Sequence, residues 1–208
     1  MLDHILDAHG GLEYWRTLSA IELEWSAWGF LFTAKGVPTV SHQRMVLSTR
    51  EPHVVIHDYP VPGQQAVFDG GNEPRAAFPK WRWDASDFAY FSSYAMWNYL
   101  NLPFLLCEPG MEVTEHPPWL TATFPPEIPT HCRTQELTFG PDGRLIRHDY
   151  TAEVVGGWAK AAHLCSDYRQ FGGLWMPTRR RVYPRGPGGR PLPAPTLVAI
   201  DIHDARPY

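Results

Sequence analysis

One stretch in the middle of the chain, residues 86–107, is apolar on nearly every side and contains no glycine. Its only proline is Pro103, so the spacing predicts a helix from about Ser86 to Asn101. A surface helix would carry polar residues along one face, whereas aromatic side chains recur all round this one. We therefore expect the helix to be buried on both sides, with the rest of the chain wrapped around it.

The segments on both sides of this helix have the composition of strands. They are short runs rich in β-branched and aromatic residues that end at glycine or proline. We predict strands at Ala20–Thr33, Gln43–Ser48, His53–Tyr59, Gln64–Asp69, Thr130–Phe139, Arg144–Val154, Ala161–Phe171, Pro177–Tyr183 and Thr196–His203. The turn at Gly140–Gly143 is a strong hairpin signal, and short turns join the last strands, so these should form an antiparallel meander.

The chain begins with two short helical patterns. Leu2–His9 has apolar residues spaced for one helical face and ends at Gly10-Gly11, and Leu12–Leu18 forms a second such pattern. No internal repeat, charge run or linker divides the 208 residues, a length that suits one large all-β domain. We therefore expect a single domain over residues 1–208, mainly β in class.

Charge and cysteine content exclude several classes of protein. The net charge of -4 leaves no basic field for phosphate backbones, so we expect no nucleic-acid partner. The three cysteines are odd in number and form no CxxC pair, which predicts free thiols in a reducing compartment. The sequence also has no secretory signal pattern and no membrane span, so we expect a cytoplasmic location.

Two stretches near the ends of the chain carry a resemblance to a known fold. One is His9–Leu12 with Trp15 and Leu18, and the other is Ser166–Arg169 followed by Gly172–Thr178. With these motifs the chain resembles the lipoprotein-localisation (LolA-like) fold, a curved, half-open antiparallel barrel with helices plugging its concave side. It also resembles a family of uncharacterised bacterial proteins that share the hairpin sequence at residues 148–150.

The resemblance implies an apolar cavity for a lipid-like or aromatic molecule. Members of the fold include acyl-chain carriers and a cofactor-free enzyme of violacein biosynthesis. The chain has ten histidines but no HxH, HExxH or paired-cysteine pattern. His53 and His57 would stand about 13 Å apart on a strand, too far to chelate one ion. We therefore expect neither a metal nor another cofactor.

The predicted hairpin supplies the candidate catalytic residues. Ile146, His148 and Tyr150 share one strand face, and His131 and Arg133 share a face of the partner strand. If these faces line the cavity, His148 is the candidate general acid or base, Tyr150 stabilises developing negative charge, and His131 assists. The alternative is that these polar side chains form an ordinary solvated face with cross-strand pairs.

Further candidates would bind the ligand around this catalytic group. Tyr168 on the next strand could donate a hydrogen bond, and Arg179 or Arg181 could pair with a carboxylate. Tyr94 and Trp97 on the central helix would close the site from the other side and exclude water. Consecutive strands lie about 4.8 Å apart, so such a site has the width of a small aromatic molecule.

Three functions remain open on the sequence alone. The first is a cofactor-independent enzyme that isomerises, cyclises or dehydrates a small apolar or aromatic molecule by acid–base chemistry. The second is a non-catalytic carrier or sensor of such a molecule. The third is a protein-interaction module that uses an exposed sheet edge.

Overall fold

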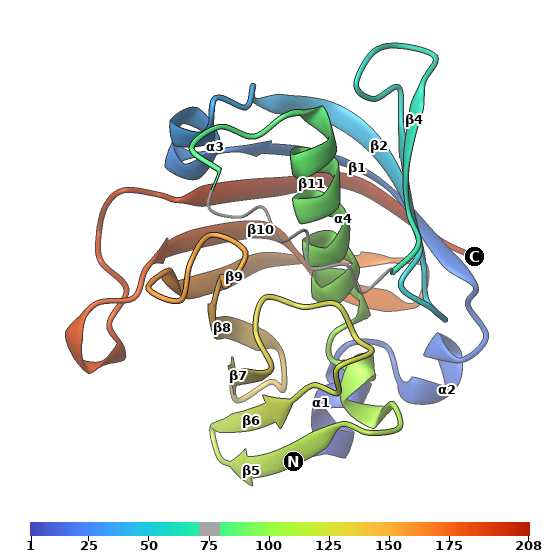
Figure 1. The fold of residues 1–208 in the computed structure, drawn as a ribbon. Coiled ribbons are helices and arrows are strands. Elements are labelled where there is room, and N and C mark those ends of the chain that lie inside the picture. Colours follow the sequence, from blue (N-terminus) through green and yellow to red (C-terminus); the bar gives the residue numbers. More distant parts are fainter. Residues whose placement is uncertain (71–79) are drawn as a thin grey trace.

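The computed structural model describes residues 1–70 and 80–208. In these residues eleven strands form one sheet, in the order β4-β3-β2-β1-β11-β10-β9-β8-β7-β6-β5. Every pair of neighbouring strands is antiparallel. The sheet is open and curved, and a long helix crosses its concave side (Figure 1). The prediction of a mainly β, half-open antiparallel barrel is confirmed.

The elements follow one another along the chain in a simple order. The strands are β1 (Ala20–Trp28), β2 (Val40–Ser48), β3 (Val54–His57), β4 (Gln65–Phe68), β5 (Glu112–His116), β6 (Trp119–Thr123), β7 (Thr134–Phe139), β8 (Leu145–Thr151), β9 (Lys160–Phe171), β10 (Leu174–Pro184) and β11 (Val198–Pro207). The helices are α1 (Leu2–Ala8), α2 (Leu12–Trp15), α3 (Phe30–Lys35) and α4 (Ala85–Asn101), with short 3₁₀ turns at Phe104–Cys107 and Pro187–Gly189.

Helix α4 is the buried helix that the sequence predicts, with its start displaced by one residue. A capping box begins it: the Asp84 carboxylate accepts a hydrogen bond from the backbone N–H of Asp87, and the Asp87 carboxylate accepts one from Asp84. The Asp87 carboxylate is also paired with the Lys80 ammonium at 3.0 Å. Every side chain from Phe91 to Asn101 is buried, on all sides of the helix. The helix thus fills the concave side of the sheet.

The first predicted strand, Ala20–Thr33, is wrong over its last five residues. Strand β1 ends at Trp28, and helix α3 occupies the rest of the range predicted as strand. Gly29 makes this change of direction, because its φ of 141° is rare for other residues and a Cβ there would lie 2.4 Å from the carbonyl oxygen of Leu197. Strand periodicity alone did not show that the glycine starts a helix.

The predicted hairpin forms, but with two departures. Strand β7 starts at Thr134, so His131 and Arg133 lie in the connection before it. A bulge shifts the register, because Thr138 pairs with Arg147 whereas Phe139 pairs with Leu145. Ile146 is the extra residue and is 45% exposed, so its predicted place beside His148 on the inner face is wrong.

The hairpin of β5 and β6 is missing from the sequence prediction. Its strands have only five residues each, and Pro117-Pro118 separates them. Such short segments give little periodicity to read. The hairpin extends the sheet from β7 to the edge strand β5.

Candidate ligand-binding site

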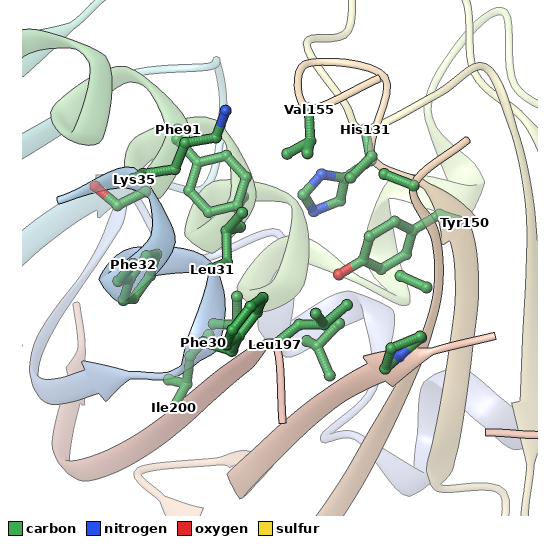
Figure 2. A pocket seen from close by; sticks show the side chains of 18 of the residues that line it. Phe30, Leu31, Phe32, Lys35, Phe91, His131, Tyr150, Val155, Leu197 and Ile200 are labelled. Atoms are coloured by element: carbon green, nitrogen blue, oxygen red, sulfur yellow. The ribbon is translucent and has the colours of Figure 1, made fainter. Parts of the chain in front are cut away.

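A cavity of about 400 Å³ lies between the concave face of the sheet and helices α3 and α4. Its wall is almost entirely apolar, and strands at both ends of the chain contribute to it (Figure 2). The apolar lining includes Trp25, Leu31, Phe32, Phe91, Ala95, Met96, Val155, Ala161, Val182, Leu197, Val198 and Ile200. Helix α3, which replaces the end of the predicted first strand, covers one side of the cavity.

Three polar side chains in the wall form a hydrogen-bonded chain with a fourth behind them. The Tyr94 hydroxyl lies 3.0 Å from Nδ1 of His131, and the Tyr99 hydroxyl lies 2.7 Å from its Nε2. The Tyr99 hydroxyl in turn lies 2.6 Å from the hydroxyl of Tyr150. His131, Tyr99 and Tyr150 line the cavity, whereas Tyr94 is packed behind His131.

The number of donors and acceptors in this chain decides which group donates at each hydrogen bond. A neutral imidazole donates from one nitrogen and accepts at the other. If Nδ1 of His131 donated to Tyr94, the buried Tyr94 hydroxyl would keep a proton with no acceptor among the described residues, which costs about 1–3 kcal/mol. In the opposite direction Tyr94 donates to Nδ1, Nε2 donates to Tyr99, and Tyr99 donates to Tyr150. The Tyr150 hydroxyl proton is then available to the cavity.

Burial keeps this chain neutral. Desolvation lowers the pKa of His131 to about 3, and it raises the pKa of Tyr150 well above its usual range. The pKa of Tyr99 is raised for the same reason, and the nearby charge of Arg180 opposes the shift. None of these groups changes its protonation state near neutral pH.

Trp25 contributes a second polar group to the cavity wall. Its indole Nε1 is buried and has no hydrogen-bond partner in the described part of the chain. An indole N–H can only donate, so this buried group lacks the acceptor that it requires among the described residues, although Trp25 belongs to the cavity lining. The sequence prediction did not include Trp25, although its place on an aromatic strand was a usable signal.

A second polar cluster lies under the ring of Tyr99, away from the cavity. His148 and His163 lie on neighbouring strands and are fully buried, and both rings contact Tyr99 edge-on. Nε2 of His148 is hydrogen-bonded to Gln135, but its Nδ1 and both nitrogens of His163 have no partner among the described residues. Burial lowers the pKa of both histidines well below the usual range.

Arg180 completes this second cluster. Its side chain is 1% exposed, donates to the Tyr99 carbonyl at 3.0 Å, and stacks over the Tyr99 ring at 5.3 Å. Within residues 1–70 and 80–208 it forms no ion pair with a carboxylate. The sequence prediction missed this residue, because it chose the alternate positions on the same strand.

The structure brings part of the predicted site together. His131 and Tyr150 line the cavity, and Tyr94 supports His131. His148 is buried in the second cluster and does not line the cavity. Its pKa is held far below the value that the predicted general acid or base requires. The catalytic role that the sequence suggests for His148 therefore has no support in this geometry.

Arg179 and Arg181 lie on the convex face of the sheet, so their predicted placement on the concave wall is wrong. Arg179 pairs with Asp167 at 3.9 Å, and Arg181 pairs with Asp201 at 2.8 Å. Residues along a strand alternate between faces, so the inward position belongs to Arg180.

Three further candidates lie outside the cavity wall. Arg133 is exposed, and its Nε donates to the Phe124 carbonyl at 3.3 Å. Trp97 faces the end of β2, where its Nε1 donates to the Ser48 carbonyl at 2.9 Å. Tyr168 is half-buried on the far side of the second cluster and donates to the Leu145 carbonyl at 2.9 Å. These three side chains hold loops and strands in place and do not line the cavity.

The mouth of the cavity combines exposed aromatic rings with cations. Phe30 is 55% exposed, Trp158 is 79% exposed and Trp81 is 91% exposed, and all three belong to the lining. Lys35 and Lys160 lie at the same opening. The polar character of the site is therefore divided, with neutral donors inside and positive charges at the entrance.

The residues that the structure describes contain neither a metal-binding cluster nor a membrane-spanning helix. They contain no group of three or more histidine, cysteine or acidic side chains placed to hold a metal ion. No helix among them is both long and apolar enough to cross a membrane. The three cysteines are unpaired thiols, with Cys132 and Cys165 buried.

Comparisons with known proteins concern the fold alone. No family model matches the chain, and no curated protein matches it. A LolA superfamily protein from Nitrosomonas europaea is 10% identical, with a TM-score of 0.42 over 97% of this chain and 91% of that one. A DUF1329 family protein from Desulfovibrio piger is 13% identical, with a TM-score of 0.46 over 99% of this chain and 91% of that one. The function has to be inferred from this chain's own side chains.

Proposed function

We propose that this protein reversibly binds a small amphiphilic molecule, as a carrier or sensor. The observation that carries this proposal is the 400 Å³ cavity with its nearly continuous apolar wall. Pockets for small molecules usually measure about 300–1,000 Å³ and combine an apolar lining with a few polar groups that fix orientation. Burial of the ligand's apolar body would supply most of the affinity, at about 25 cal/mol per Å².

The polar groups of the wall define what the ligand carries. The Tyr150 hydroxyl donates at the end of the hydrogen-bonded chain, so the ligand should bring a carbonyl, ether or similar acceptor into the cavity. A charged ligand group would be poorly placed inside the cavity, because the ionisable groups of the hydrogen-bonded chain are all uncharged near neutral pH. An anionic group fits better at the mouth, where Lys35 and Lys160 lie.

The acid–base enzyme remains the second candidate, because a hydrogen-bonded chain from Tyr94 through His131 and Tyr99 ends at Tyr150 in the cavity. Reversing every hydrogen bond in this chain would turn the terminal hydroxyl from donor to acceptor. The pKa of His131 near 3 favours the carrier, because general acid–base catalysis works best when the pKa of the catalytic group is close to the working pH.

The protein-interaction alternative depends on the sheet edges. The edge strands β4 and β5 are only four and five residues long. β5 carries Glu112 and Glu115, and charged side chains on short edge strands oppose pairing with another chain. These features give the interaction module less support than the cavity gives ligand binding.

A pair of alanine substitutions on helix α4 tests the binding proposal. Ala95 lines the cavity, whereas Ala89 lies on the same helix outside it. We expect Ala95→Phe to fill the cavity and weaken binding of an apolar naphthalene fluorophore at least tenfold, and Ala89→Phe to leave it within about twofold. Equal affinity for both variants, with unchanged circular dichroism, would contradict the proposal.

A second measurement separates the carrier from the enzyme. Any small molecule that copurifies is identified by native mass spectrometry, returned to the stripped protein and followed by NMR. Unchanged ligand signals over hours support a carrier or sensor. New product signals that disappear in Tyr150→Phe would instead support the acid–base enzyme.

A further inference from the structure

The mouth of the cavity is built from three chain segments that are far apart in the sequence. Phe30 begins α3, Trp81 precedes α4, and Trp158 lies in the connection between β8 and β9. We call these three residues, with Lys35 and Lys160, the mouth patch. Their exposed fractions of 55%, 91% and 79% leave two indoles and a phenyl ring in water around one opening. Large apolar side chains gathered in this way are characteristic of a surface that contacts something else.

Trp158 is placed at the opening by its own backbone. Its indole lies over Gly156, where a Cβ would come within 2.5 Å of the indole nitrogen. Gly156 has a φ of 152°, which other residues rarely adopt, so both its conformation and the contact require glycine. The loop therefore presents the indole at the mouth instead of packing it into the core.

The cations of the mouth patch are not neutralised by acidic neighbours in the described residues. Lys160 forms no ion pair there, and the Lys35 ammonium donates to the Lys80 carbonyl at 2.6 Å. Arg185, the other cation of the cavity lining, pairs with Asp149 at 3.3 Å and Glu136 at 3.6 Å. Within residues 1–70 and 80–208 the mouth thus carries two lysines without an acidic partner, on a chain whose net charge is -4.

We propose that the mouth patch docks on an anionic lipid bilayer, with the aromatic rings in the headgroup region and the lysines against acidic lipids. Indoles favour the boundary between water and lipid, because their rings are apolar and their N–H groups still find polar partners. Each lysine near such a surface strengthens binding about fivefold at moderate salt. Because the cavity opens in the middle of the patch, docking would face the cavity mouth to the lipid.

The role of this docking rests on the proposed function, since a bilayer would be the source or destination of the amphiphilic ligand. The docking itself can be measured without any ligand. A protein partner or a second copy of the chain is the competing occupant. Charge complementarity favours the bilayer, because two copies would bring Lys35 and Lys160 against the same lysines.

Vesicle sedimentation tests the docking. We expect the protein to bind vesicles of phosphatidylcholine with about 30% phosphatidylglycerol, and to bind pure phosphatidylcholine vesicles at least tenfold more weakly. Raising NaCl from about 50 mM to about 500 mM should release most of the bound protein, because it shortens the Debye length. Absence of binding to the anionic vesicles would overturn the inference.

Matched variants tie the binding to the mouth patch. Trp158→Ala should weaken vesicle binding about fivefold to tenfold, and Lys160→Glu should weaken it more. Trp119→Ala is the control, because Trp119 is 44% exposed on β6 and does not line the cavity. If Trp119→Ala and Trp158→Ala weaken binding equally, or if the free protein forms a dimer that Trp158→Ala dissociates, the patch is not a bilayer-docking surface.

A parallel measurement keeps this inference separate from the proposed function. Binding of the naphthalene fluorophore is followed in lipid-free buffer for the native protein and for Lys160→Glu. If the fluorophore binds the cavity while vesicles are not bound, the docking inference fails and ligand binding stands. If vesicles are bound but Ala95→Phe leaves the fluorophore affinity unchanged, docking stands and the proposed function fails.

Discussion

The imidazole ring of His131 lies flat against the phenol ring of Tyr150, with the ring centroids 4.0 Å apart and the planes inclined by 5°. His131 comes from the connection before β7 and Tyr150 from β8, and the hydroxyl of Tyr99 on α4 bridges the two. The stack and the bridge together place a helix, a strand and a loop in one rigid wall of the cavity.

The buried histidines make the protein sensitive to acid. The pKa of His9 is lowered to about 4 and that of His131 to about 3, mainly by burial, and those of His148 and His163 lie well below the usual range. In the unfolded chain each takes up a proton near pH ~6.5. The unfolded state therefore binds more protons between that pH and the folded pKa values, and stability falls as the pH falls through this window.

Each such histidine contributes about 1.4 kcal/mol per pH unit to this loss. We expect urea denaturation to show a free energy of unfolding that drops steeply from about pH 6 to about pH 4.5, with a slope approaching four protons. A stability that stays constant over this range would show that the histidines are protonated without cost in the folded protein.

His131 and His163 should respond differently to removal. His131→Leu leaves the buried Tyr94 hydroxyl without its partner and removes one of the two hydrogen bonds of the Tyr99 hydroxyl, so we expect a loss of about 2–3 kcal/mol at neutral pH. His163 has no hydrogen-bond partner in the part of the chain that the structure describes, so His163→Leu should cost less than about 1 kcal/mol and reduce the acid slope by one proton. Chemical denaturation at two pH values measures both, and equal losses would refute the assigned hydrogen bonds.

Tyr150 and Tyr94 occupy opposite ends of the same hydrogen-bonded chain. Tyr150→Phe removes the donor that faces the cavity, so ligand affinity should fall about fivefold to tenfold through the loss of one hydrogen bond. Tyr94→Phe removes the end that does not line the cavity, and affinity should stay within about twofold. Both variants lose a buried hydrogen bond, so stability alone does not separate them. Calorimetric titration with the copurified ligand does, and a larger effect of Tyr94→Phe would place the ligand elsewhere.

The cysteines should differ in reactivity. Cys107 is half-buried, whereas Cys132 and Cys165 are buried, and burial raises the pKa of all three thiols. Because the thiolate is the reactive form, we expect a disulfide reagent at about pH 8 to modify Cys107 first and the other two much more slowly. All three should react together after denaturation without reductant. A count below three under those conditions would indicate a disulfide.

The sequence predicted the elements whose signal is local. The aromatic run around Phe91 is apolar on every side, so only a buried helix accounts for it, and α4 starts within one residue of the predicted position. The turn at Gly140–Gly143 likewise fixed the β7–β8 hairpin, because its backbone requirements are met within four residues. The short hairpin of β5 and β6 lacked such a signal and was missed.

The candidate site depended on details that are not local. Three consecutive arginines fit either face of a strand, and the pairing of Arg180 with Cys165 on β9 and Ile200 on β11 turns Arg180 inward and its two neighbours outward. The bulge at Ile146 likewise follows from how β8 pairs with β7. Register is decided by which face the whole sheet buries, so it cannot be read from one strand.

By itself the sequence determined that this chain wraps a β sheet around an aromatic helix, because burial patterns and turn residues act over a few positions. Only the tertiary structure decided that His131 and Tyr150 stack in the wall of the cavity while His148 lies under Tyr99 outside it. Residues 32 to 51 positions apart meet there through the packing of α4 on the sheet. The pKa of His131 then follows from that packing, because desolvation depends on everything that surrounds the ring.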